Sequence, residues 1–213
     1  MFSGIIKYKS KILDIKYWIF TIENNFSKDN ESLEIGQSIA HDWACMTVLR
    51  FNDTKYSFFA MEESFKKTNF WDKKIWDYLN TETSLKFDWK VDWHFVTGHI
   101  DSVWKINKIK TLEDKSKIIR LEFKKKFKDN IIEKGSIAIN WVSLTVINLK
   151  KNKFSVSLIP LTQDITNLWN LKVWDKVNLE FDMMWKYILK YMKNLAKPIP
   201  NPSGTAPANA RVF

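Results

Sequence analysis

Cysteine, glycine and long apolar segments are all scarce in this chain of 213 residues. The single cysteine, Cys45, excludes an internal disulfide and is typical of a protein from a reducing compartment. No apolar run approaches the length that a membrane-spanning helix requires. The first residues lack the basic stretch and the longer apolar segment of a signal peptide. We therefore expect a cytoplasmic protein with no membrane partner.

Glycine accounts for only five residues, about 2% of the chain, where roughly 7% is usual. Tryptophan is abundant instead, with eleven residues. Several tryptophans occupy contexts typical of turns, such as Asn69–Asp72 and Val173–Asp175. Such turns often need a residue with positive φ, which glycine adopts at little cost. The pattern indicates that tryptophan stands where glycine is expected.

A net charge of +10 is compatible with nucleic-acid binding, because basic surfaces attract phosphate. The lysines, however, are spread along the chain, and clusters such as Lys124–Lys126 are short. A solvated lysine-rich surface explains the same charge. A basic barrel that stacks nucleic-acid bases on its tryptophans therefore stays an alternative function.

The two halves of the chain repeat one another at a constant offset of 98 residues. Near the two starts the offset is 94, which pairs Gly4 with Gly98, and at one matched position Cys45 is replaced by Ser143. The longer matches are Ser38–Ala40 with Ser136–Ala138, Thr47–Val48 with Thr145–Val146, Thr68–Asn69 with Thr166–Asn167, and Trp76–Asp77 with Trp174–Asp175. We predict two copies of one domain, at residues 1–90 and 91–182.

Each copy contains short segments typical of β-strands, for example Lys117–Phe123, Phe154–Leu158 and Val177–Phe181. Met61–Lys67 predicts a short helix that ends at Thr68–Asn69. Many short strands separated by turns favour a small closed barrel, which has no free sheet edge. We predict an all-β fold of two tandem six-stranded closed β-barrels, followed by a C-terminal α-helix.

That helix is predicted over Met183–Leu195, within an oligomerisation segment at residues 183–196, and Pro198 ends the helical pattern. One stripe of the helix is apolar and consists of Met184, Ile188, Met192 and Leu195. A stripe outside both barrels needs a partner, and we expect another subunit. Residues 197–213 are rich in proline and small residues, which predicts disorder.

Five ordered motifs stand out along the chain. They are MFSGII at 1–6, SIAHDWACMTV at 38–48, HFVTGHID at 94–101, KGSIAINWVSLTV at 134–146, and the Ile-Pro and Thr-Asn-Leu segment at 159–168. Together these motifs resemble those of the riboflavin synthase family. The chain departs from common family residues at Asn140, Leu161 and Phe65.

The resemblance also bears on the tryptophans. In the family, glycine occupies the positions of Trp43, Trp71, Trp76, Trp93, Trp141, Trp169 and Trp174, and glycine also suits Trp104 and Trp185. Some bacterial lineages read the codon UGA as glycine, whereas a commonly applied code reads it as tryptophan. We hypothesise that UGA-encoded glycines are written here as Trp. Glycine and tryptophan together make about 7.5% of the chain, close to the usual glycine share of roughly 7%.

The resemblance implies the last step of riboflavin biosynthesis, a dismutation of two molecules of 6,7-dimethyl-8-ribityllumazine to riboflavin and 5-amino-6-(ribitylamino)uracil. It implies no metal and no organic cofactor. It also implies a homotrimer, with two ligands stacked between the N-terminal barrel of one subunit and the C-terminal barrel of its neighbour. Lumazine synthase is a further candidate partner, and nucleic acid is not one. Proximity, orientation and proton transfer would supply the catalysis.

Three residues are catalytic candidates. Cys45 is a nucleophile or a polar positioning group, and the alternative is a small buried apolar residue. His99 is a proton-transfer group, because histidine exchanges protons near neutral pH, and the alternative is a structural histidine. Ser38 assists Cys45 or is only a strand residue. His41 and His94 are interpreted as non-catalytic.

The resemblance implies two half-sites, one for each copy. The first contains Gly4, Ile5, Ile6, Cys45, Met46, Thr47, Met61, Glu62, Glu63, Ser64, Phe65 and Lys66. The second contains Gly98, His99, Ile100, Lys134, Ser143, Leu144, Thr145, Ile159, Pro160, Leu161, Thr162, Gln163 and Asp164. A non-catalytic lumazine- or flavin-binding relative of the same fold is the nearest alternative to the enzyme.

Overall fold

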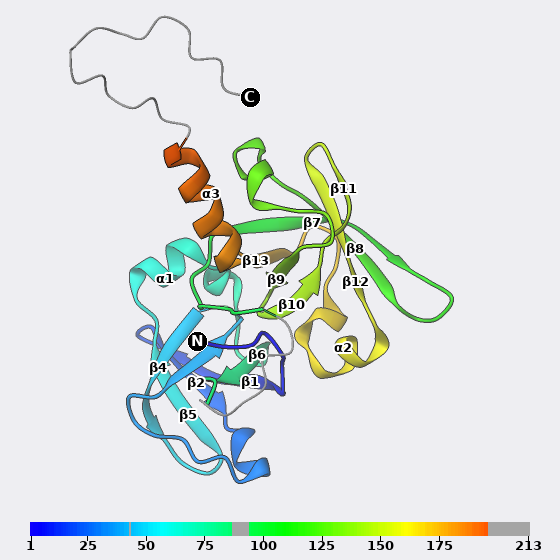
Figure 1. Ribbon diagram of the computed structural model, residues 1–213. Coiled ribbons are helices and arrows are strands. Elements are labelled where there is room, and N and C mark those ends of the chain that lie inside the picture. Colours follow the sequence, from blue (N-terminus) through cyan, green and yellow to red (C-terminus); the bar gives the residue numbers. More distant parts are fainter. Residues whose placement is uncertain (43, 87–93, 196–213) are drawn as a thin grey trace, which may run out of the picture.

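Alternating buried and exposed side chains organise each half of the chain into β-strands (Figure 1). The computed structural model describes residues 1–42, 44–86 and 94–195. Within these ranges each half forms an antiparallel barrel, and a helix follows the second barrel. The predicted all-β fold with two barrels and a C-terminal helix is confirmed.

The first barrel is closed. In hydrogen-bonding order its strands are β1 (Tyr8–Lys16), β2 (Ile19–Glu23), β5 (Lys55–Phe59), β4 (Ala44–Phe51), β3 (Ser38–His41) and β6 (Tyr78–Thr83). In β4 the buried Met46 and Val48 alternate with the exposed Cys45 and Thr47. Cys45 and Thr47 therefore lie on the outer face of the barrel.

The second barrel repeats this order with one strand divided. Its strands are β10 (Val142–Thr145), β9 (Ser136–Ile139), β13 (Lys176–Phe181), β7 (Ser102–Thr111), β8 (Lys117–Glu122), β12 (Lys153–Leu158) and β11 (Ile147–Lys150). The edge strands β10 and β11 follow one another in the chain, with Val146 between them. Asn148 has a φ of 55°, and the pairing of β11 with β12 shifts register around it. The six closed strands of the prediction thus become seven strands in a nearly closed barrel.

Short helices follow the fifth strand position of each barrel. They are α1 (Glu62–Lys67) with the 3₁₀ turn η2 (Phe70–Asp72), and α2 (Pro160–Ile165) with η4 (Asn167–Asn170); two further 3₁₀ turns are η1 (Phe26–Asp29) and η3 (Lys125–Asn130). Phe65 of α1 is buried in the first core. Gln163, at the equivalent position of α2, is also buried, and its Nε2 donates to the carbonyl oxygens of Lys115 and Leu158. Each helix therefore packs against its own barrel.

The C-terminal helix, α3, spans Met183–Leu195 as predicted. Its predicted apolar stripe is exposed to solvent, from 45% at Ile188 to 67% at Leu195. Among the described residues, no helix has the length and apolar character needed to cross a membrane. The tail predicted at 197–213 lies outside the described residues.

The second hydrophobic core extends beyond its barrel to Phe2, Ile6, Ala40 and Val96. Phe2 and Val96, which are 94 residues apart, form an antiparallel bridge. Phe2 N donates to Val96 O at 2.9 Å, and Val96 N donates to Phe2 O at 3.0 Å. We call residues 2–5 and 96–99 the leading segments of the two repeats. They therefore meet between the barrels at matched positions of the repeat.

Among the tryptophans that the structure describes, four adopt the left-handed backbone that favours glycine. They are Trp18 (φ 69°), Trp76 (77°), Trp141 (75°) and Trp174 (79°). The expectation of positive φ is therefore correct at Trp174. It is wrong at Trp71, which lies inside the 3₁₀ turn η2. Trp43 and Trp93 lie outside the described residues.

Candidate active site

The leading segments of the two repeats cross between the barrels. The carbonyl oxygen of Gly4 accepts a hydrogen bond from Ser143 N of the second barrel at 2.9 Å. A Cβ placed on Gly98 would lie 2.8 Å from Cys45 Cβ and 3.2 Å from Cys45 N of the first barrel. The half-sites that the resemblance implies group Gly4 with Cys45 and Gly98 with Ser143. The structure pairs them crosswise, because the Phe2–Val96 bridge carries each segment onto the other barrel.

Glycine is required at both crossings. Gly4 has a φ of 72° and Gly98 a φ of 85°, a region that bulkier residues adopt at a cost. A Cβ on Gly4 would also lie 3.0 Å from Ser143 Cβ. The two segments can therefore lie directly on β4 and β10 only because they have no side chain at these positions.

The crossing brings the two leading catalytic candidates into neighbouring positions. Cys45 is an exposed, free cysteine on the outer face of β4. His99 is also exposed, and it directly follows Gly98, which contacts Cys45. Ser38 is half-buried and is the strand partner of Thr47, whereas Cys45 is paired with Ala40. Ser38 thus lies two residue pairs from Cys45, on the same outer face.

Ser143 makes a contact that the interpretation of the histidines did not include. His94 Nδ1 and Ser143 Oγ are 2.7 Å apart, and His94 is only 8% exposed. Burial lowers the pKa of His94, and the charge of Asp182 opposes that shift only in part. The neutral imidazole can accept a hydrogen bond from the hydroxyl of Ser143. The repeat gave no signal for this pair, because His94 has no counterpart in the first copy.

The other predicted binding residues differ in exposure. Exposed are Thr47, Met61, Glu62, Glu63, Lys66, Lys134, Thr145, Ile159, Pro160, Leu161 and Asp164; half-buried are Ile5, Ser64, Ile100 and Thr162; buried are Ile6, Met46, Phe65, Leu144 and Gln163. Met46 and Leu144 belong to the two cores, so they can present only main-chain atoms to a ligand. Within the described residues, no group of His, Cys, Asp and Glu side chains is arranged to hold a metal ion.

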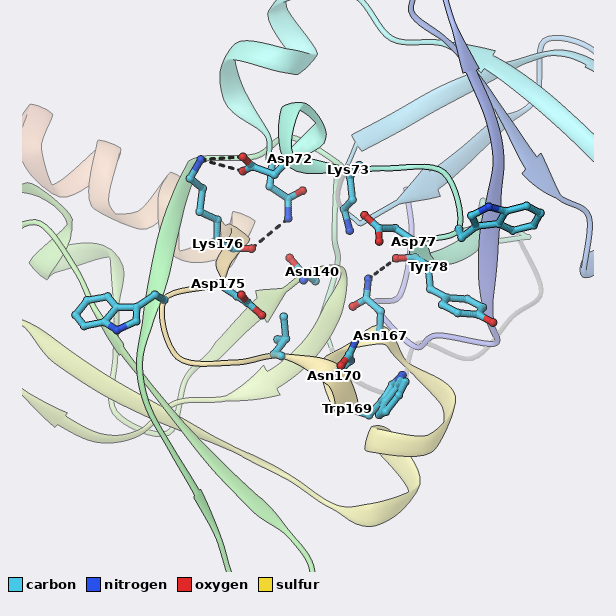
Figure 2. Close-up of a pocket in the computed structure, with 14 residues that line it drawn as sticks. Asp72, Lys73, Asp77, Tyr78, Asn140, Asn167, Trp169, Asn170, Asp175 and Lys176 are labelled. Atoms are coloured by element: carbon cyan, nitrogen blue, oxygen red, sulfur yellow. Dashed lines mark hydrogen bonds and ion pairs between the residues drawn. The ribbon is translucent and has the colours of Figure 1, made fainter.

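A cavity of about 560 Å³ lies elsewhere, where residues 69–78 of the first barrel face residues 167–176 of the second (Figure 2). Many of its lining residues are pairs at the repeat offset, such as Asp77 with Asp175. Figure 2 shows both carboxylates beside this space, together with Lys73. The described lining includes none of the predicted catalytic or binding residues, so the cavity is separate from the crossing.

Asparagines join the two barrels beside this cavity. Asn80 Nδ2 donates to Asn140 O at 2.6 Å, and at the equivalent positions Asn178 Nδ2 donates to Asp42 O at 2.8 Å. One feature breaks the symmetry: the buried Asp42 carboxylate forms an ion pair with Lys73. Burial raises the pKa of Asp42, and Lys73 opposes that shift. The network holds the barrels in the orientation that the crossing requires.

Comparisons with known proteins agree with this two-barrel organisation. The family model of the lumazine binding domain matches residues 3–84 and 97–182. Riboflavin synthase of Actinobacillus pleuropneumoniae is 35% identical over 206 residues, which are 95% of this chain and 94% of the relative. Riboflavin synthase of Buchnera aphidicola subsp. Schizaphis graminum is 36% identical over 201 residues, 92% of this chain and 96% of the relative.

Solved structures share the fold at lower identity. The crystal structure of LumP complexed with riboflavin has a TM-score of 0.77 at 23% identity, and the complex with 6,7-dimethyl-8-(1'-D-ribityl) lumazine has 0.75 at 22%. Each of the two matches covers 85% of this chain and 99% of the LumP chain. The sequence relatives and the matched domains carry the assignment: the chain belongs to the riboflavin synthase family and is built from two lumazine-binding domains.

Proposed function

We propose that the protein is a riboflavin synthase that converts two molecules of 6,7-dimethyl-8-ribityllumazine into riboflavin and 5-amino-6-(ribitylamino)uracil. The observation that carries the proposal is the crossing of the barrels. It sets Gly98, and with it His99, against the strand of Cys45. Relatives that match nearly the whole chain are riboflavin synthases.

The reaction suits a protein made of two similar barrels. One lumazine donates a four-carbon unit and the other accepts it, so two copies of the same ring system must bind close together. The two substrates supply all the atoms of the two products, and no external oxidant or reductant is needed. Binding both rings in a fixed geometry turns a bimolecular step into an effectively intramolecular one.

The residues at the crossing have distinct roles in this proposal. Cys45 acts as a nucleophile or polar group toward the ligand on the first barrel, and His99 transfers protons there. Thr47 and Thr145, both exposed, offer hydroxyls to the ribityl chains or ring oxygens. Ser143, with the neutral His94 beside it, is the corresponding polar group of the second barrel.

The assembly is part of the proposal. Exposed Met184, Ile188 and Met192 of α3 form an apolar stripe that a neighbouring subunit would cover in a homotrimer. In that trimer, the N-terminal barrel of one subunit faces the C-terminal barrel of the next. Lumazine synthase, which would supply the substrate, is a candidate partner. The single cysteine supports a cytoplasmic location.

We further propose that the native protein has glycine at the eleven tryptophan positions. Positive φ at Trp18, Trp76, Trp141 and Trp174 supports this, because a bulky residue is strained there and glycine is not. Mass spectrometry of the protein from its native source tests it. We expect an intact mass below 25.4 kDa by eleven indole side chains, and a mass of 25.4 kDa would refute the substitution.

A second function is a non-catalytic lumazine- or flavin-binding protein. The specific observation in its favour is the structural likeness to LumP, which has been crystallised with riboflavin and with a lumazine. Retention of both Cys45 and His99 at one crossing favours the enzyme.

Turnover decides between the two functions. The chain with glycine at the eleven tryptophan positions would be mixed with the dimethyl-ribityllumazine, and riboflavin would be followed by its absorbance and fluorescence. We expect one riboflavin for every two lumazines consumed. Cys45→Ala and His99→Ala should each reduce kcat about 100-fold, while Lys55→Ala, exposed on β5, should leave it unchanged. Tight lumazine binding without riboflavin formation would establish the second function instead.

A further inference from the structure

Each barrel buries one glutamate on its outer face, at the same position of its last strand. Glu82 of β6 is 4% exposed and Glu180 of β13 is 1% exposed. Both are strand partners of an alanine, Ala40 or Ala138, that packs between the barrels. A carboxylate removed from water is costly unless several donors satisfy it. The partners of these two carboxylates are therefore informative.

Both glutamates bind the main chain of a leading segment. Glu82 Oε1 accepts hydrogen bonds from Ser3 N and Ser3 Oγ, both at 2.7 Å, and its Oε2 accepts one from Gly4 N at 3.0 Å. Glu180 Oε1 accepts from Thr97 N at 2.8 Å and from Thr97 Oγ1 at 2.7 Å, and its Oε2 accepts from Gly98 N at 3.0 Å. The same carboxylate geometry thus holds both segments.

The segments held in this way are those that cross to the other barrel. Glu180, in the second barrel, fixes the segment that lies on Cys45 of the first. Glu82, in the first barrel, fixes the segment whose Gly4 carbonyl binds Ser143 of the second. Each carboxylate therefore acts across the boundary, on the half-site of the opposite barrel.

The two glutamates differ in two contacts. Glu82 Oε2 accepts a further hydrogen bond from Trp141 Nε1 of the second barrel, and within the part of the chain that the structure describes Glu180 makes no equivalent bond. Glu180 Oε2 also accepts a hydrogen bond from His99 N at 3.2 Å. The equivalent residue of the first segment is Ile5, whose N–H donates instead to Ser3 Oγ at 3.2 Å. Glu180 thus holds the backbone of the proton-transfer residue directly, whereas Glu82 does not hold its counterpart.

We propose that Glu82 and Glu180 are positioning residues for the two lumazine half-sites, and that Glu180 in addition orients His99 beside Cys45 for proton transfer. This inference rests on the proposed riboflavin synthase function. Neither carboxylate needs to touch the substrate. Each acts through backbone N–H groups that it locks in place, and a rigid segment keeps the reacting groups aligned.

The matched variants Glu180→Gln and Glu82→Gln test the inference. Glutamine keeps the size of the side chain but replaces one acceptor oxygen with an NH₂ group. At least one backbone N–H of the segment then loses its acceptor, and the segment is held less firmly. We expect E180Q to lower kcat about tenfold or more and to alter the pH profile of kcat. E82Q should raise KM severalfold and leave the shape of the pH profile unchanged. Glu122→Gln, an exposed position on β8, is the control and should change neither.

Hydrogen exchange gives a readout that does not depend on turnover. The amides of Thr97, Gly98 and His99 should exchange faster in E180Q but not in E82Q, and Glu180→Asp, which keeps the charge, should restore part of kcat. Equal loss of thermal stability in both variants, with kcat, its pH profile and amide exchange unchanged, would overturn the inference. If the parent chain forms no riboflavin, the synthase function fails, and unchanged exchange in E180Q would then also refute the positioning role.

Discussion

The two barrels have the same strand order, the same helix positions and the same buried glutamate, but they differ in polarity along one hairpin. At the repeat offset, His41, Asp42 and Cys45 of the first barrel are replaced by Ile139, Asn140 and Ser143 of the second. All three differences lie on β3, on β4 or in the turn between them. The features that build a barrel are thus shared, whereas at these three positions of the hairpin only the barrel that contains Cys45 has ionisable side chains. The comparison indicates that the two half-sites are chemically unequal.

The largest difference between the barrels should appear at low pH, where the first barrel should lose more stability than the second. His41 is fully buried, its Nε2 lies 2.7 Å from Tyr56 Oη, and burial lowers the pKa of His41 to about 3. Because the folded-state pKa lies below the unfolded value of about 6.5, the neutral histidine stabilises the fold fully above pH 6.5. That stability is lost as the pH falls from 6.5 toward 3, by up to about 5 kcal/mol.

The second barrel supplies the control, with Ile139 and Phe154 at the matched positions. The double variant His41→Ile/Tyr56→Phe should remove most of the acid sensitivity when urea unfolding is followed between pH 7 and pH 4. An unchanged slope of the unfolding free energy against pH would contradict a role for His41.

The Asp42–Lys73 ion pair, which lies in the first half of the chain, offers the next largest effect. Lys73→Leu copies Leu171 of the second half but leaves the buried Asp42 charge without its cation. We expect a loss of about 3 kcal/mol in the free energy of unfolding. Adding Asp42→Asn, which copies Asn140, should restore most of it, and simple additivity of the two single variants would show that the pair is not coupled.

Glycine-to-alanine variants should distinguish the stability lost to backbone strain from the stability lost to a close contact with the opposite barrel. Gly36, with a φ of 86° and nothing within 4 Å of an added Cβ, measures strain alone, and Gly36→Ala should cost about 1 kcal/mol. Gly98→Ala adds the 2.8 Å contact with Cys45 and should cost about 2 kcal/mol or more. Gly4→Ala, with its 3.0 Å contact, should fall between them in thermal unfolding. Equal losses at all three positions would mean that the segments do not press on the opposite barrel.

The sequence predicted much of the fold because the repeat and the strand patterns are local. Both predicted helices, Met61–Lys67 and Met183–Leu195, occur in the structure, since each has a clear pattern and a clear end. The crossing could not be predicted in the same way. It depends on two backbone hydrogen bonds between Phe2 and Val96, and main-chain pairing leaves no side-chain pattern in the sequence.

Two further features needed the three-dimensional arrangement. The contact of His94 with Ser143 joins residues that are far apart in the chain and have no repeat signal. Glu82 and Glu180 stand at the repeat offset of 98 residues, but only the structure shows that their carboxylates bind the leading segments. The prediction of a turn at Trp71 is correct, but the prediction of positive φ there is wrong, because a turn built as a 3₁₀ helix needs no residue with positive φ.

The most direct test of two unequal but functional half-sites is the number of ligands bound by each chain. An 8-ribityllumazine without the two methyl groups cannot donate the four-carbon unit, so its binding can be measured by titration calorimetry without turnover. We predict two molecules bound per chain, with different affinities for the Cys45 and Ser143 half-sites. One molecule per chain would contradict the account, because a single site cannot bring donor and acceptor together.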